Sequence, residues 1–141
     1  MKRINCDVFM KDGSTLDLLN KVICITGNFY AGKNCSVSTA IIAGGSVILE
    51  DYADTASIWA DGDVSIGDFA NVLSVSSSKS ISLGDFSSAN DIFATEDVVM
   101  GYQADAYSIT AGGDIIENRY CKLRTFWRKL CMDIKYFFNQ C

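Results

Sequence analysis

The chain has 141 residues, 49% of them hydrophobic, and a formal net charge of −5. This length is enough for the core of one domain. The absence of histidine excludes Ser–His and Cys–His catalytic pairs and histidine-ligated metal sites. No stretch approaches the roughly 18 consecutive apolar residues of a membrane-spanning helix.

The amino-terminal part, residues 1–26, contains two apolar stretches that are predicted to be strands, Ile4–Met10 and Leu16–Ile25. Lys11, Asp12 and Gly13 between them have the composition of a turn. Because this part fits the repeat that follows poorly, we expect it to form an atypical unit that closes the amino-terminal end of the repeat array.

A repeat of 17 residues dominates the middle of the chain, up to about Ile116. Four segments align without insertion or deletion, and they start at Gly44, Asp61, Ser78 and Thr95. Residues 27–43 fit the same period more loosely. Such a short fixed period predicts an all-β protein, a β-solenoid with 17-residue coils over residues 27–116. Right-handed winding is expected because parallel crossovers favour that hand.

The columns of the repeat predict which side chains face inward. Three columns are apolar: Val47, Val64, Ile81, Val98 and Ile115; Leu49, Ile66, Leu83 and Met100; Ile41, Ile58, Val75, Ile92 and Ile109. A fourth column holds the small residues Ser36, Ala53, Ala70, Ser87 and Ala104. A glycine column is predicted to turn the chain with positive φ, at Gly67, Gly84 and Gly101. Just beyond it lies an aromatic column, Tyr52, Phe69 and Phe86.

Charge divides the chain into an acidic repeat and a basic end. Residues 44–114 contain twelve acids and one base, a net charge of −11, whereas residues 117–141 contain six bases and two acids, a net charge of +4. Six of the acids fall into two columns: Asp51, Asp68 and Asp85; Asp63, Asp97 and Asp114. One interpretation is corner chemistry, in which aspartate bonds to its local backbone. The other is an acidic surface that binds cations or a basic protein.

The carboxy-terminal segment, residues 117–141, is predicted to be an amphipathic helix, because its apolar residues recur at steps of three and four. These residues are Leu123, Phe126, Trp127, Leu130, Ile134, Phe137 and Phe138. Such a helix would cap the open end of the solenoid. Two alternatives are a peripheral contact with an anionic membrane and docking on a partner or on a second copy of the chain.

Catalytic, metal-binding and cofactor-binding signatures are not found in the sequence, so no enzymatic activity is expected. The six cysteines, at positions 6, 24, 35, 121, 131 and 141, show no paired spacing of a metal site. With no secretory signal after Met1, reduced thiols in the cytoplasm are the expected state.

The pattern G-D-V-x-I-G-D-F followed by a small residue occurs at residues 62–70 and again, as SISLGDFS, at residues 80–87. It resembles the bactofilin-type and other polymer-forming bacterial β-solenoids. The resemblance covers about half the chain and implies a cytoplasmic protein that polymerises end to end and scaffolds others. The amphipathic carboxy-terminal segment departs from that family, because a cap would block one end of the rod.

Two functional hypotheses follow. The first is a non-enzymatic scaffold or protein-interaction module that self-associates. The second is an inhibitor or immunity-type protein that binds a basic toxin or nucleic-acid-binding protein through its stacked carboxylates; the same acidic surface would repel nucleic acid itself.

Overall fold

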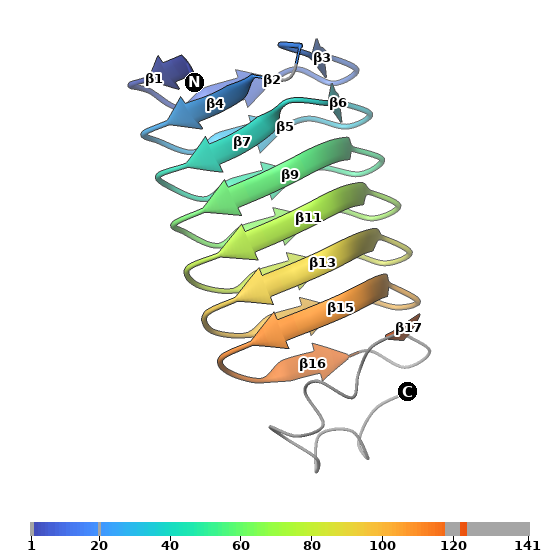
Figure 1. Ribbon diagram of the computed structural model, residues 1–141. Helices are drawn as coiled ribbons and strands as arrows, with labels where there is room; N and C mark the ends of the chain where they lie inside the picture. Colours follow the sequence, from blue (N-terminus) through green and yellow to red (C-terminus); the bar gives the residue numbers. More distant parts are fainter. Residues whose placement is uncertain (1, 20, 118–121, 124–141) are drawn as a thin grey trace.

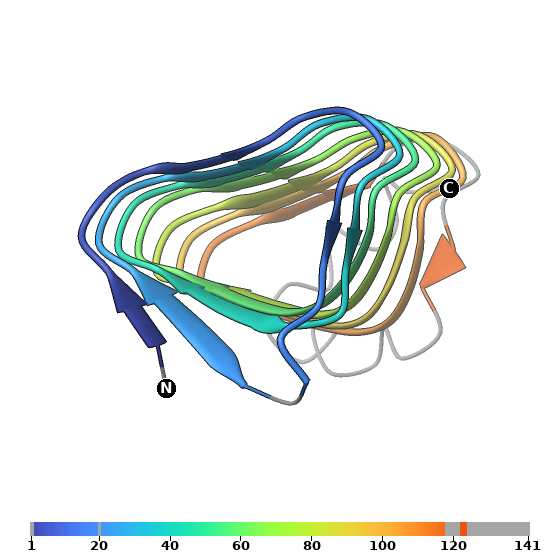
Figure 2. The ribbon, with the colours of Figure 1, turned by 90° about the horizontal axis from the view of Figure 1, so that it is seen from above.

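The computed structural model describes residues 2–19, 21–117 and 122–123. The chain winds into seven stacked coils, and every strand pairs in parallel with the strand of the next coil (Figure 1). The prediction of an all-β solenoid is therefore confirmed. Seen from above, each coil has a roughly triangular outline (Figure 2).

One side of the triangle is a seven-stranded sheet with one short strand from each coil. Its strands are β2 (Val8–Met10), β5 (Phe29–Ala31), β8 (Val47–Leu49), β10 (Val64–Ile66), β12 (Ile81–Leu83), β14 (Val98–Met100) and β16 (Ile115–Glu117). Successive side chains point to opposite faces of a strand. In β8, β10, β12 and β14 the middle residue is accordingly exposed and its neighbours are buried.

A ten-stranded sheet forms the other two sides. In the first two coils these sides carry separate strands: β3 (Thr15–Leu16) and β6 (Ser36–Val37) on one, and β1 (Lys2–Ile4), β4 (Val22–Ile25) and β7 (Ala40–Ala43) on the other. From the third coil on, one strand of seven residues covers both sides: β9 (Asp54–Ala60), β11 (Asn71–Ser77), β13 (Ser88–Ala94) and β15 (Asp105–Ala111). Last in this sheet is β17 (Lys122–Leu123).

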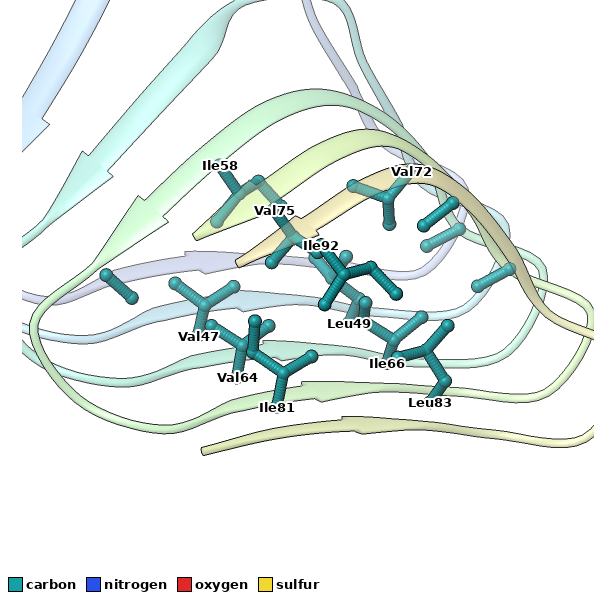
Figure 3. Packing of buried hydrophobic residues seen from close by; sticks show 14 of the residues in the cluster. Val47, Leu49, Ile58, Val64, Ile66, Val72, Val75, Ile81, Leu83 and Ile92 are labelled. Atoms are coloured by element: carbon teal, nitrogen blue, oxygen red, sulfur yellow. The ribbon is translucent and has the colours of Figure 1, made fainter. Parts of the chain in front are cut away.

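The core lies inside the coils and consists of the three predicted apolar columns. Strand pairing places Val47 beside Val64, Leu49 beside Ile66, and Ile58 beside Val75, as the repeat predicts. Figure 3 shows these side chains stacked on their counterparts from the coils above and below. Because each coil buries the same positions, one coil provides the packing surface for the next, which is the basis of solenoid stability.

The first coils are longer than the repeat, and this changes one predicted column. Val8 pairs with Phe29, an offset of 21 residues, and Phe29 pairs with Val47, an offset of 18. The offset returns to 17 at Ile41, which pairs with Ile58. The extra residue of the second coil lies before Ile41, so Cys35 and not Ser36 occupies the small-residue column. Cys35 is buried and its carbonyl accepts a hydrogen bond from the N–H of Asp54.

The glycine column has a different role from the predicted one. Positive φ occurs two residues later, at Tyr52 (63°), Phe69 (58°) and Phe86 (58°), and not at the glycines. A Cβ on Gly84 would instead lie 2.6 Å from the carbonyl carbon of Gly67 in the preceding coil. The glycines are required because the backbones of neighbouring coils approach too closely for any side chain.

The two ends of the described chain also differ from the predictions. The stretch predicted as one strand, Ile4–Met10, forms the end of β1 and all of β2, with a corner between them; the predicted turn at Lys11–Gly13 is confirmed. At the other end, Leu123 lies in β17, paired with Ala106, so a helix over residues 117–123 is wrong. The other predicted helix residues, Phe126, Trp127, Leu130, Ile134, Phe137 and Phe138, lie outside the described residues. Within residues 2–19, 21–117 and 122–123, no helix is long and apolar enough to cross a membrane.

Candidate functional site: the corners of the solenoid

The first acidic column forms a ladder of hydrogen bonds between coils, which we call the Asp51 ladder (Asp51, Asp68 and Asp85). The Oδ1 atom of Asp51 accepts a bond from the backbone N–H of Asp68 at 2.9 Å, and Asp68 accepts from the N–H of Asp85 at 2.8 Å. Asp85 in turn accepts from the N–H of Tyr102 at 2.8 Å. The carboxylates stack as predicted, but each bonds to the next coil and not to its local backbone. Each ladder bond therefore ties two coils together.

The second acidic column, the Asp63 ladder (Asp63, Ser80, Asp97 and Asp114), has the same construction with a serine in the second position. Asp63 accepts a bond from the N–H of Ser80 at 3.1 Å, and the hydroxyl of Ser80 accepts from the N–H of Asp97 at 3.2 Å. Asp97 accepts from the N–H of Asp114 at 2.8 Å. The serine lowers the charge density of this column, because Asp63 and Asp97 are two coils apart.

The two ladders do not merge into a single acidic face. Asp63 directly precedes β10 and Asp68 follows it after Gly67, so the ladders lie at opposite ends of the strands of the seven-stranded sheet. The six predicted acids thus border that sheet along both edges. A partner that contacts all six would have to span the sheet.

Both ladders extend into the first coils, where the sequence analysis did not find them. Asp7 accepts a bond from the N–H of Asn28 at 2.7 Å, and the side-chain oxygen of Asn28 accepts from the N–H of Ser46 at 2.8 Å. On the other edge Asp12 accepts from the N–H of Lys33 at 2.8 Å. The longer offsets of these coils hid them, although a polar residue just before or just after an apolar strand was a usable signal.

An exposed aromatic column lies beside the Asp51 ladder. Tyr52 stacks on Phe69 with ring centroids 5.2 Å apart, and Phe69 stacks on Phe86 at 5.0 Å. Tyr102 continues the column with an edge contact to Phe86 at 5.5 Å. The predicted column is confirmed and is one residue longer. Offset-stacked and edge-to-face rings attract each other, so the column adds a second set of contacts between coils.

The outer face of the seven-stranded sheet is apolar near both ends. Phe9 is 71% exposed and stacks on Tyr30 at 4.7 Å, while Ile48, Val99 and Ile116 are also exposed. The Tyr30 hydroxyl donates a hydrogen bond to Glu50 at 3.0 Å, and this bond to a carboxylate raises the pKa of Tyr30. Sequence analysis missed this face, because the columns of inward residues were followed and the middle strand positions were not.

The ten-stranded sheet carries a shallow open groove of about 380 Å³ on its outer face. Val22, Ala40, Ile42 and Trp59 form its apolar part, and Ser57, Ser74 and Ser76 form the remainder. Trp59 is 63% exposed at its edge. Among the described residues, no three cysteine or acidic side chains are placed to hold a metal ion.

Searches of protein-family models, of curated proteins and of solved structures gave no match to this chain.

Proposed function

We propose that the protein is a non-enzymatic β-solenoid scaffold or protein-interaction module that associates with copies of itself. The observation that carries this proposal is the alignment of exposed large apolar side chains along the rod. The aromatic column is one example, with Tyr52 56%, Phe69 46% and Phe86 44% exposed. Contiguous exposed apolar surface is typical of interaction sites.

The regularity of the coils supports the same proposal. From Val47 on, strand pairing keeps an offset of 17 residues up to Ile115, so no loop rises from these coils. Flat sheet faces and straight corners offer extended contact surfaces. The bactofilin-type resemblance implies an assembly role of this kind.

A cytoplasmic location is part of the proposal. Cys6, Cys24 and Cys35 are free thiols, and Cys35 is buried in the small-residue column. Free thiols are typical of a reducing compartment. Peripheral contact of residues 117–141 with a membrane remains an alternative to their role in assembly, and vesicle flotation would distinguish the two.

Light scattering of the full chain on a sizing column, at low and moderate salt, tests the proposal. Self-association predicts a mass that is a multiple of 15.4 kDa and rises with protein concentration. A constant mass of 15.4 kDa at all concentrations would contradict it.

A second candidate function is an acidic inhibitor of a basic protein, and the two carboxylate ladders favour it. They hold charges at fixed spacings of about 4.8 Å, the distance between strands. Electrostatic complementarity would give fast, salt-sensitive association with a basic partner. Pull-down with a panel of basic toxins and nucleic-acid-binding proteins, at two salt concentrations, tests this function. Capture that does not weaken at higher salt would argue against the ladders as the binding surface.

A further inference from the structure

The corner that carries the Asp51 ladder also carries the aromatic column, and together they form a continuous ribbon along the rod. Asp51, Asp68 and Asp85 each stand directly before an aromatic residue in the sequence. Because the acids and the rings both stack coil upon coil, the ribbon consists of a carboxylate row beside an apolar row. We call it the acid–aromatic ribbon (residues 51–52, 68–69, 85–86 and 102).

The ribbon is held in place by contacts that leave chemistry available to a partner. The ladder bonds use the Oδ1 atom of each aspartate. The rings cover each other's faces, so about half of Tyr52, Phe69 and Phe86 remains exposed at the ring edges. These exposed rings also adopt positive φ, which is uncommon for bulky residues and is characteristic of functional sites when it recurs.

A ligand for this ribbon must offer apolar side chains and positive charges in alternation. The chain contains one such segment outside the ribbon, residues 124–141. It carries Arg124, Arg128, Lys129 and Lys135 among Phe126, Trp127, Leu130, Ile134 and Phe137. Arginine both pairs with carboxylates and packs against aromatic rings.

We propose that the acid–aromatic ribbon binds residues 124–141 of a second copy of the chain. This inference rests on the proposed self-association and names its surfaces. Binding between copies is favoured over binding within one copy by the direction of β17. That strand runs parallel to β15, with Lys122 beside Asp105 and Leu123 beside Ala106. The chain therefore passes residue 123 in the direction that leads away from the corner of the ribbon.

Two matched double variants test the proposal in the full chain. Asp68→Asn with Asp85→Asn removes two charges from the ribbon; Asp63→Asn with Asp97→Asn removes two from the other ladder. Both retain the side-chain oxygen of the ladder, a role that Asn28 already fills in the native chain. Measured by sedimentation at low salt, the ribbon variant should weaken self-association at least tenfold. The control variant should change it less than about threefold. Circular dichroism checks that both remain folded.

A charge exchange tests whether the contact joins two copies. Asp68→Lys with Asp85→Lys gives a basic ribbon, and Lys33 shows that the column accommodates lysine. Arg128→Glu with Lys129→Glu gives an acidic carboxy-terminal segment. Each variant alone should associate weakly, whereas a mixture of the two should associate, because each then offers what the other lacks. Failure of the mixture to associate would overturn the contact between copies.

The remaining outcomes separate this inference from the proposed function. A wild-type chain that stays monomeric removes self-association and the inference together. Oligomers that tolerate both asparagine variants, or that lose affinity equally with both, leave self-association standing and overturn the ribbon as its surface.

Discussion

Replacing Thr55 with valine is predicted to stabilise the protein. Thr55 lies in β9 and points into the core, where it is 5% exposed and its hydroxyl has no hydrogen-bond partner among the described residues. Its partners in neighbouring coils are Val37 and Val72, both buried. The column thus already holds β-branched apolar residues of the same shape on both sides of Thr55.

The size of the effect follows from the cost of burying a hydroxyl without a partner. That cost is about 1–3 kcal/mol in proteins. Because valine keeps the branched shape and adds only a methyl group in place of the hydroxyl, little strain should offset the gain. We expect Thr55→Val to raise the free energy of unfolding by about 1–2 kcal/mol. For a chain of this size this corresponds to a rise in Tm of roughly 3–8 °C.

Thr39→Val provides a control of opposite sign. Thr39 is also buried, at 1% exposed, but its hydroxyl oxygen accepts a bond from the N–H of Leu18 at 2.7 Å. Valine there would leave a donor unpaired and should cost about 1–2 kcal/mol. Thermal and urea unfolding followed by circular dichroism measure both variants. A destabilised Thr55→Val protein, or the same sign for both variants, would refute the reasoning.

Three further predictions concern the corners. Gly84→Ala should destabilise the protein by about 2–3 kcal/mol in urea unfolding, because the new Cβ meets backbone of the preceding coil at 2.6 Å; a cost below 0.5 kcal/mol would contradict the close approach. Asp68→Ala should cost about 1 kcal/mol by losing a ladder bond, whereas Asp68→Asn should be neutral or stabilising at low salt; equal losses would remove the ladder bond as the cause. Tyr30 should titrate above the usual tyrosine pKa of about 10 in ultraviolet absorbance, so its bond to Glu50 contributes stability below pH 10 and loses it as the pH rises through the raised pKa; Glu50→Gln should lower that pKa.

The period of the repeat was enough to predict the architecture and most of the core. A solenoid repeats its environment from coil to coil, so Val64 or Ile92 faces inward for the same reason as its counterparts, and simple alignment finds them. The sequence did not reveal the first two coils in this way. Offsets of 21 and 18 residues put Phe29 and Cys35 out of step with the later columns, although their strands continue the same sheets.

The interpretation of the corners was less accurate, because sequence composition does not distinguish between reasons for the same residue. Glycine at position 84 suggested positive φ, yet the cause is contact with the preceding coil, and the strained conformation falls on Phe86. Aspartate suggested a local turn bond, yet Asp68 bonds one coil further on. Both errors arise because stacking, which is absent from a single repeat, decides the role of the corner residues.

The uniform offset of the later coils makes the coil a unit of length. Ala60 and Ser77 occupy equivalent positions, as do Asp61 and Ser78, whose N–H groups bond to the carbonyls of Ala43 and Ala60. Excision of residues 61–77 would therefore join Ala60 to Ser78 with the strands, the ladders and the aromatic column still in register. The rod can change length only in steps of one coil, about 4.8 Å each, and each step adds or removes one acid–aromatic pair. The strength of any contact along the ribbon would then be set by the number of coils.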